Sequence, residues 1–420
     1  MSLRVALFLS FLVVVLSAAV SAHAQDGPEL FTPETVTLAG DVRIAGADGE
    51  PGWLDGGYGK TRFDGTNSGD FRIRPQLAEA DLIWEPRFTW SLTGTIVAVA
   101  QQDQEHPVDL SEATLQFKPL LPGPAKLNVR AGLYWPAVSL EHTGPEWRVT
   151  DTITPSAINS WIGDEVKVVG TEATVSTMIG SHRVAATLGA FGFNDTAGTL
   201  LAFRGWALHD EKATAFGRQP LPPLDPFMQT AQAPSTRPVI EIDHRIGWYA
   251  KLGWSPSEHF ELQAFHYDNR ADPEAVTAAL QWGWRTRFNN LGAIASLGHF
   301  QLKAQALGGR TEMGFPMPTR IWVDTSFRSA FLLATRNFDR GSVSARVEAF
   351  GTRSRGSVLD DEYSEDGWAF TAAARREIAP HFTLLAEYLH IESRKEARTD
   401  IGLAPRQRTN QVQIALRVRI

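Results

Sequence analysis

Apolar and polar residues alternate with a period of two along most of the chain after about residue 35. The segment 300–306 (FQLKAQA) places Gln301, Lys303 and Gln305 on one face and only apolar side chains on the other. Segments 342–349 (SVSARVEA) and 410–420 (NQVQIALRVRI) repeat the pattern. Because successive strand residues point to opposite faces, each segment is predicted to be a strand between an apolar and a wet surface. No sustained helical stripe competes with it.

Strand length separates two classes of all-β protein that share this alternation. Many alternating segments run for about a dozen residues, whereas strands of soluble proteins are about half as long. Aromatic residues also gather near the predicted strand ends, as in the girdles that flank the lipid-facing band of membrane barrels. These residues are Trp84, Trp90, Trp248, Trp254, Trp282, Trp284, Phe327, Phe331 and Tyr388. The pattern favours a transmembrane antiparallel β-barrel over a soluble sandwich.

The predicted strands cover residues 35–46, 71–84, 88–101, 108–118, 125–134, 165–178, 182–192, 244–254, 259–269, 280–296, 300–312, 324–336, 341–353, 366–377, 382–394 and 408–420. The connections alternate between short turns and mostly longer loops, which is typical of bacterial outer-membrane barrels. The layout closes at about 16 strands if segment 200–210 (LLAFRGWALHD) belongs to the long fourth loop, and about 18 strands would follow if it spans.

The first residues predict export. Residues 5–18 (VALFLSFLVVVLSA) form an apolar run that is short for a membrane-spanning helix, and Ala22-His23-Ala24 fits a signal-peptidase site. A single-pass anchor is the alternative. We therefore predict a signal peptide over 1–24 with cleavage at Ala24-Gln25, an N-terminal extension over 25–34, and an outer-membrane barrel over 35–420.

Composition narrows the possible partners. The chain contains no cysteine, so neither a disulfide nor a cysteine-ligated metal is possible. Its 40 Lys and Arg against 47 Asp and Glu argue against a nucleic-acid partner. We expect no metal and no cofactor. The expected partners are outer-membrane lipid, the barrel-assembly machinery and small anions or other polar solutes.

The polar strand faces are predicted to line a water-filled pore. The basic candidates for this lining are Arg72, Arg74, Lys126, Arg130, Arg183, Arg245, Lys251, Arg285, Arg287, Lys303, Arg328, Arg336, Arg346, Arg375, Arg417 and Arg419, and the acidic ones are Glu79, Asp81, Glu172, Glu261, Glu348 and Glu387. Basic rings in a pore favour anions, so an anion-leaning channel is expected. Alternatively, arginines pair with carboxylates across neighbouring strands and contribute little selectivity.

The third loop, 135–164, is aromatic and apolar for a solvated loop. We predict that it folds inward and narrows the pore; outward packing on neighbouring loops or in a subunit interface is the alternative. A helix is expected to begin after Thr154 as N-cap, with Pro155 at its first position, and to end at Gly163. The predicted constriction residues are Trp135, Glu141, Glu146, Trp147, Arg148, Asp151 and Trp161. The fourth loop, 193–243, could cover the pore mouth or contact another subunit.

Segments 129–141 (VRAGLYWPAVSLE), 157–161 (AINSW) and 165–170 (EVKVVG) resemble the phosphate-selective (polyphosphate-selective) porin family and its relatives. The resemblance implies a trimeric barrel of about 16 strands that passes anions along inward arginines and lysines. A phosphate site is not implied, because Arg148 stands among acidic residues. The terminal Ile420 also departs from the phenylalanine that usually ends such proteins.

Motifs for catalysis are missing from the sequence. It contains no G-x-S-x-G, H-E-x-x-H, P-loop or G-x-G-x-x-G pattern, so no enzyme is expected. Two other functions stay open. The barrel could have a blocked lumen and act as an adhesin or structural protein, or it could be a membrane hydrolase with a Ser/His pair assembled in space.

Overall fold

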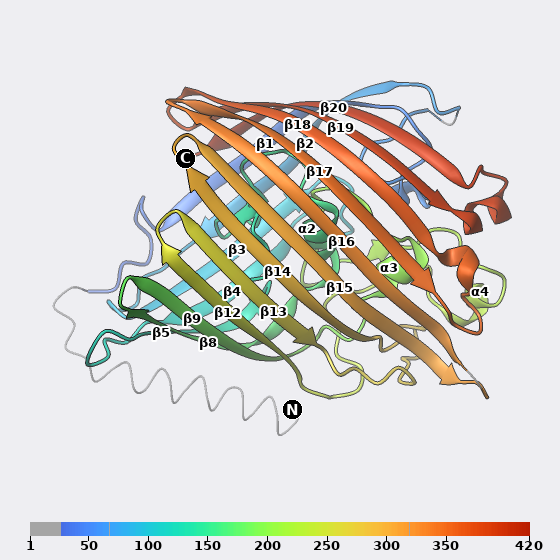
Figure 1. Ribbon diagram of the computed structural model, residues 1–420, viewed down its shortest axis with the longest axis horizontal. Coiled ribbons are helices and arrows are strands. Elements are labelled where there is room, and N and C mark those ends of the chain that lie inside the picture. The colour runs from blue at the N-terminus through green and yellow to red at the C-terminus, as the bar shows by residue number, and fades with distance from the viewer. Residues whose placement is uncertain (1–26, 67, 319) are drawn as a thin grey trace.

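Sixteen antiparallel strands form one closed barrel in the computed structural model, which describes residues 27–66, 68–318 and 320–420 (Figure 1). The predicted signal peptide lies outside the described residues. The barrel closes where β1 pairs with β20, at positions such as Ala39 and Arg419. Segment 200–210 lies in the fourth loop, so the predicted count of 16 strands is confirmed.

The barrel strands are β1 (Val36–Ala47), β2 (Arg72–Trp84), β3 (Leu92–Gln101), β4 (Asp109–Phe117), β5 (Lys126–Tyr134), β8 (Val168–Ile179), β9 (His182–Gly192), β12 (Gly247–Ser257), β13 (Phe260–Asp268), β14 (Arg285–Leu297), β15 (Phe300–Pro316), β16 (Ile321–Phe338), β17 (Gly341–Ser354), β18 (Glu365–Ala379), β19 (Phe382–Lys395) and β20 (Arg406–Arg419). Each predicted strand corresponds to one of these, within a few residues at either end.

The two rims of the barrel differ. At the short-turn rim, which holds the end of β20, most connections are tight, such as 180–181, 298–299 and 339–340. The connections at the opposite, long-loop rim include the third and fourth loops, 135–167 and 193–246. None of the described helices is long and apolar enough to cross a membrane.

The outer wall carries the apolar half of the alternation. Leu252 and Leu291 are each 63% exposed, and Val42 and Ile44 are similarly open to the surroundings. Side chains of this kind are stable on an outer surface where hydrocarbon replaces water. The alternation thus gives the strands a lipid-compatible exterior, and their other faces point to the barrel interior.

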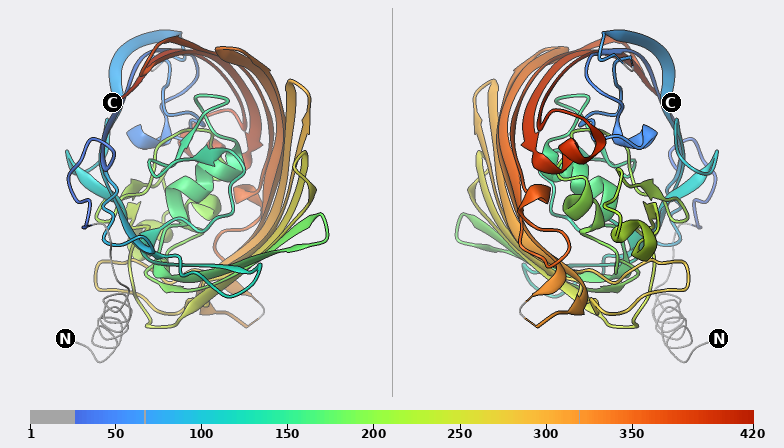
Figure 2. Two further views of the ribbon diagram at one scale, coloured as in Figure 1. Left: turned by 90° about the vertical axis from the view of Figure 1, so that its left-hand side faces the viewer. Right: turned by 90° about the vertical axis from the view of Figure 1, so that its right-hand side faces the viewer.

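The third and fourth loops fold into the barrel, as the end-on views show (Figure 2). Residues 152–168 and 194–209 are all buried or nearly so, which an outward loop could not achieve. The loop and rim elements are η1 (Trp53–Asp55), β6 (His142–Thr143), β7 (Arg148–Val149), α2 (Ala157–Glu165), α3 (Thr199–Phe203), β10 (Gln219–Pro220), α4 (Met228–Ala231), β11 (Ser235–Thr236), η2 (Asp361–Tyr363) and η3 (Glu396–Ile401).

The predicted helix of the third loop exists, but both of its ends were placed wrongly. Its N-cap is Ser156, whose hydroxyl accepts a hydrogen bond from the Asn159 amide at 3.3 Å, and not Thr154. The Thr154 amide instead donates to Glu387 on the barrel wall. A contact distant in sequence therefore decides where the helix begins, and the helix continues past Gly163 to Glu165.

Candidate functional site

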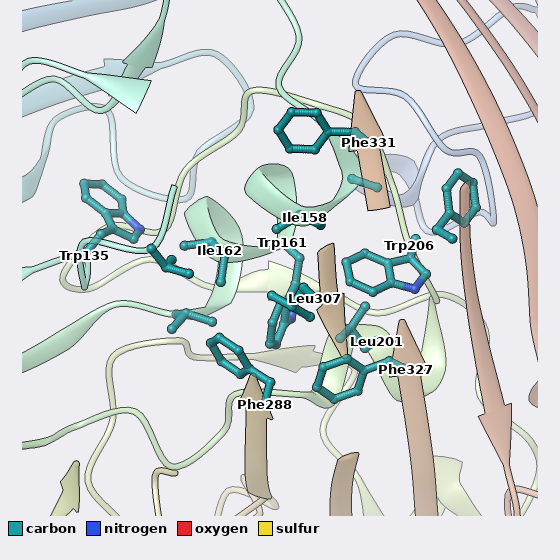
Figure 3. Close-up of a cluster of buried hydrophobic side chains, with 14 of the residues drawn as sticks. Trp135, Ile158, Trp161, Ile162, Leu201, Trp206, Phe288, Leu307, Phe327 and Phe331 are labelled. Carbon is teal, nitrogen blue, oxygen red and sulfur yellow. The ribbon is translucent and has the colours of Figure 1, made fainter. Parts of the chain in front are cut away.

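An apolar core fills one side of the barrel interior (Figure 3). Trp161 of α2 lies at its centre, with ring centroids 5.3 Å from Phe288 on β14, 5.2 Å from Phe327 on β16 and 6.1 Å from Trp206 of the fourth loop. Inward aromatic residues of the wall thus pack directly against both infolded loops. Water is excluded from this side, so this part of the interior is a packed core rather than a pore lining.

Buried carboxylates hold the loop backbones against one another and against the wall. Glu387 of β19 accepts the Ile153 amide at 2.6 Å, and Glu348 of β17 accepts the Ala157 amide at 2.7 Å. Glu165 accepts the Leu200 amide at 2.8 Å and so joins the third loop to the fourth. Burial raises the pKa of Glu165 to about 7. These bonds satisfy amides that would otherwise be stranded inside the barrel.

Arg346 of β17 is the centre of the same network. It points inward as predicted, but its side chain is fully buried. It forms ion pairs with Glu141 at 2.9 Å and with Glu348 at 2.8 Å, and it donates to the Pro155 carbonyl at 3.0 Å. Because every face of the guanidinium is occupied by protein, Arg346 fixes the third loop and does not meet solvent.

A column of paired charges occupies the opposite side of the interior, beside β1, β2 and β20. Its basic members are Arg43, Arg62, Arg74, Arg148, Lys212, Arg417 and Arg419, and its acidic members are Asp41, Asp64, Glu79, Asp81, Glu146, Asp210 and Glu211. We call these residues the charged column. It extends from Arg74, near the long-loop rim, to Arg419 at the short-turn rim.

Contacts within the column are short and shared. Arg148 of the third loop lies 2.7 Å from both Glu79 and Asp81, and Lys212 of the fourth loop lies 2.8 Å from Glu79. Charges of both loops and of the wall thus meet at one height of the barrel. A cavity of about 10 Å³, lined partly by Glu79, Arg148 and Lys212, lies among them. That volume is about the size of one water molecule.

Two larger cavities lie inside the barrel near the short-turn rim. One, of about 450 Å³, is lined by polar side chains together with Arg130, Arg183, Lys251, Glu172 and Glu261. The other, of about 220 Å³, has as its charged lining Glu146, Arg148, Arg375, Glu377, Arg417 and Arg419. We call them the first and second vestibules. Their combined lining contains more basic than acidic groups.

All seven predicted constriction residues lie inside the barrel. Their charged members form ion pairs with residues of the barrel wall. These pairs are Glu141 with Arg346, Glu146 with Arg419, Arg148 with Glu79 and Asp81, and Asp151 with Lys303. Trp135 and Trp147 stack at 5.0 Å, and Trp161 lies in the apolar core. The third loop therefore folds inward.

Strand register decides where each predicted lining residue points. Eleven of the basic candidates share a face with inward residues: Arg72, Arg74, Lys126, Arg130, Arg183, Lys251, Lys303, Arg346, Arg375, Arg417 and Arg419. Arg245 precedes β12 and pairs with Asp272 in a neighbouring loop at 2.6 Å. The acidic candidates also point inward.

Arg285, Arg287, Arg328 and Arg336 do not point inward, and their predicted placement was wrong. On β14 the inward residue between the first two is Thr286, followed by Phe288 of the apolar core. The interior of this region is apolar, and the strand ends project past the outer apolar band. The polar face of the alternation is therefore the outer face here. The alternation alone does not say which face is inside.

Several charged-column residues were not anticipated from the sequence. Asp41 and Arg43 lie on the inward face of β1 and alternate with the exposed Val42 and Ile44, so the pattern could have revealed them. Asp210, which pairs with Arg43 at 2.6 Å, sits in an irregular part of the fourth loop where no periodicity operates.

Three carboxylates near the long-loop rim lie close enough together to be tested as a cation site. Oxygens of Asp195, Glu241 and Asp243 lie within 4.8 Å of one another. They already accept backbone amides, such as that of Ile242 on Asp195 at 2.6 Å and that of Phe193 on Glu241 at 3.0 Å. This cluster therefore closes the start of the fourth loop onto its end.

No protein-family model matches the chain, and no curated protein matches it in sequence. Solved structures do match its fold. The outer membrane channel DcaP of Acinetobacter baumannii matches at 10% identity with a TM-score of 0.56, covering 95% of this chain and 99% of DcaP.

A loop-deletion form of OmpT, an outer membrane protein of Vibrio cholerae, matches at 11% identity with a TM-score of 0.51, over 94% of this chain and all of that one. An anion-selective porin of Comamonas acidovorans matches at 11% identity with a TM-score of 0.50, covering 94% of this chain and all of that porin. The chain therefore has the barrel fold found in outer-membrane porins, and its membership of the phosphate-selective family is not supported.

Proposed function

We propose that the protein is an outer-membrane channel that passes small polar solutes along the charged column. The observation that supports this most directly is the asymmetry of the interior. An apolar core closes one side, whereas a continuous series of ion-pairing groups follows the other from Arg74 to Arg419. A polar solute can replace water and protein partners along such a series, but it cannot cross packed aromatic rings.

Orientation follows from the rims. In bacterial barrels short turns face the periplasm and longer loops face outward, so we place the third and fourth loops at the extracellular side. The two vestibules then open toward the periplasm. Export by cleavage at Ala24-Gln25 belongs to the same proposal, as does a homotrimer, which crosslinking of the purified protein in mild detergent would reveal as a three-chain band.

A weak preference for anions is the expected selectivity. The charged column contains equal numbers of basic and acidic groups, which argues against a strong preference. Burial raises the pKa of Glu211 to about 8, so near pH 7 its protonated form leaves the basic groups in excess. The vestibules add a further excess through residues such as Arg130, Arg183 and Lys251. A preference for phosphate over other anions is a finer proposal that the same measurements test.

Recordings from planar bilayers test the channel directly. Purified protein should give stepwise currents, with a reversal potential in a potassium chloride gradient that lies modestly on the anion side. Replacing chloride with phosphate at equal ionic strength then shows whether phosphate permeates. Currents that are absent under all these conditions would overturn the channel.

Burial of the loops favours a second function. Residues 152–168 and 194–209 have almost no contact with solvent, so a barrel that stays closed and acts through its extracellular surface is the competing proposal. Electrically silent but correctly folded protein would favour it. Folding can be checked independently by the heat-dependent shift in gel mobility that barrels show when they unfold.

A further inference from the structure

Six arginines form a group on the outer wall, near the long-loop ends of β14 to β17. They are Arg285, Arg287, Arg310, Arg328, Arg353 and Arg355, and we call them the outer arginine belt. Register places Arg287 beside Arg310, Arg310 beside Ser326, and Ser326 beside Arg353, all on the outward face. The group thus continues across four neighbouring strands.

The belt lies immediately beyond the apolar band of the outer wall. Arg328 lies one outward row closer to the middle of the barrel than Arg287, Arg310 and Arg353. In the next outward row, register aligns Leu291, Ala306, Ala330, Ala349 and Trp368 across β14 to β18. Leu291 is 63% exposed and Trp368 is 45% exposed on this face. If that band contacts hydrocarbon, as we propose, the arginines lie at the depth of the lipid headgroups.

Acidic neighbours neutralise only part of the belt. Arg310 pairs with Asp324 at 2.6 Å, Arg353 with Asp366 at 2.7 Å, and Arg287 approaches Glu312 at 3.7 Å. Within the described part of the chain, the side chains of Arg285, Arg328 and Arg355 form no ion pair or hydrogen bond. Three positive charges therefore remain available on this surface.

A hollow of about 270 Å³ lies among these charges, lined by Arg328, Arg353, Arg355 and Asp366 with Gly351 beneath them. Gly351 stands between Arg328 and Asp366 in the register. A Cβ atom at this position would lie 2.8 Å from the Glu365 carbonyl oxygen, so the hollow depends on a glycine. Guanidinium groups that converge on a small hollow suit a phosphate, which they can bind in a bidentate manner.

We propose that this hollow binds the phosphate group of a lipid in the surrounding outer leaflet. The inference rests on the membrane placement given above, but it does not require the barrel to conduct. A lipid fits better than a free anion because the acyl chains would lie along the apolar row that begins directly below the arginines. A lipid phosphate bound here would anchor the barrel at a fixed depth and rotation.

Native mass spectrometry of the whole protein tests the proposal. Protein in mild detergent is mixed with equimolar phosphatidic acid, phosphatidylglycerol and phosphatidylcholine, and the retained lipids are compared. We expect phosphatidic acid to be retained most and phosphatidylcholine least. The double variant Arg328→Gln/Arg355→Gln should reduce the preference by about fivefold for each lost charge, the size expected for an arginine beside an anionic lipid surface.

The matched control is the double variant Arg336→Gln/Arg376→Gln. Arg336 and Arg376 are exposed, outward arginines at the opposite ends of β16 and β18, so their replacement also removes two positive charges without touching the hollow. Equal loss of lipid preference in both variants, or no preference in the parent protein, would overturn the proposal.

Two further outcomes would overturn the lipid assignment and identify a different partner for the hollow. If inorganic phosphate at millimolar concentration displaces phosphatidic acid completely, the hollow is a free-anion site and the lipid assignment fails. If the double variant instead changes the number of chains per particle, the surface is a contact between copies. Bilayer recordings of the same double variant separate the test of the lipid site from the test of the channel. A variant that loses its lipid preference but gives normal currents has lost the lipid site alone.

Discussion

The two sides of the barrel interior hold the same loops by different physics. On the side of β13 to β19, aromatic and aliphatic residues pack around Trp161 and leave no room for water. On the side of β1, β2 and β20, ion pairs such as Arg148 with Glu79 and Asp81 hold the loops, with only small apolar clusters beside them, such as that of Ile153 with Leu385 and Ala415. Packed apolar contacts are not replaced by solvent without a large cost. The charged column offers a polar solute contacts of the kind it makes with water, although pairs such as Arg43 with Asp41 are buried and must open for passage.

This difference assigns separate tasks to the two sides. Under the proposed function, the apolar core fixes the position of α2, and the charged column sets which solutes can move past it. Substitutions in the core should therefore alter stability and pore size, and substitutions in the column should alter selectivity. The following predictions test that separation, beginning with the largest expected effect.

Trp161→Ala should have the largest effect. It removes a buried indole from between Phe288, Phe327 and Trp206, and such truncations cost about 3–5 kcal/mol in packed cores. We expect a marked fall in the unfolding temperature and a several-fold rise in single-channel conductance, because α2 loses its main contact. Trp90→Ala is the control, since Trp90 is 56% exposed in the connection between β2 and β3. Unchanged conductance in Trp161→Ala would show that α2 does not limit the pore.

Arg148→Glu should act on the other side of the interior. The substitution removes a guanidinium that lies 2.7 Å from both Glu79 and Asp81 and adds a third carboxylate beside them. We expect the reversal potential to move clearly toward cations. The stability loss should be about 3 kcal/mol, the lower end of the range for a buried ion pair that loses one partner, because Glu79 and Asp81 are buried. Bilayer recordings in a salt gradient measure the reversal potential, and thermal unfolding measures the loss of stability. A conductance rise like that of Trp161→Ala, without a change in selectivity, would contradict the proposed division.

The sequence predicted the wall of the barrel more fully than its contents. Period-two alternation located all the strands because lipid outside and a protein interior impose it along every strand. It could not say that the interior beside Phe288 is apolar, because that depends on loops folding in from distant positions. Arg285 and Arg287 were accordingly placed on the wrong face. The start of α2 was missed for a similar reason, since Glu387 binds the Thr154 amide from the far end of the chain.

A pH-dependent effect of intermediate size is expected at the joint between the two loops. Burial raises the pKa of Glu165 from 4.5 to about 7. Between these values the folded protein holds a proton that the unfolded chain releases, so stability should fall as pH rises across this window. Above it the buried carboxylate is ionised and the loss is complete.

Thermal unfolding at pH 5 and pH 8 measures this effect. The parent protein should unfold at a temperature several degrees lower at pH 8, by the usual relation between free energy and unfolding temperature. Glu165→Gln should reduce that difference, because it cannot ionise. Glu258→Gln, at an exposed turn, is the control. A pH profile identical in all three proteins would show that Glu165 carries no such linkage.

The smallest effect is expected from a comparison of two arginines, Arg183 and Arg285, which the alternating pattern alone predicts to lie on the same inward face. Arg183 lines the first vestibule with its side chain 62% exposed, whereas Arg285 projects from the outer wall. Arg183→Glu should move the reversal potential toward cations by only a few millivolts, because the vestibule is wide and its charges are screened within about 10 Å at 0.1 M salt. Arg285→Glu should leave it unchanged, since the β-barrel wall separates that charge from the permeating ions. Equal shifts in both variants would mean that the net charge of the whole barrel, and not the face on which a residue lies, governs ion entry.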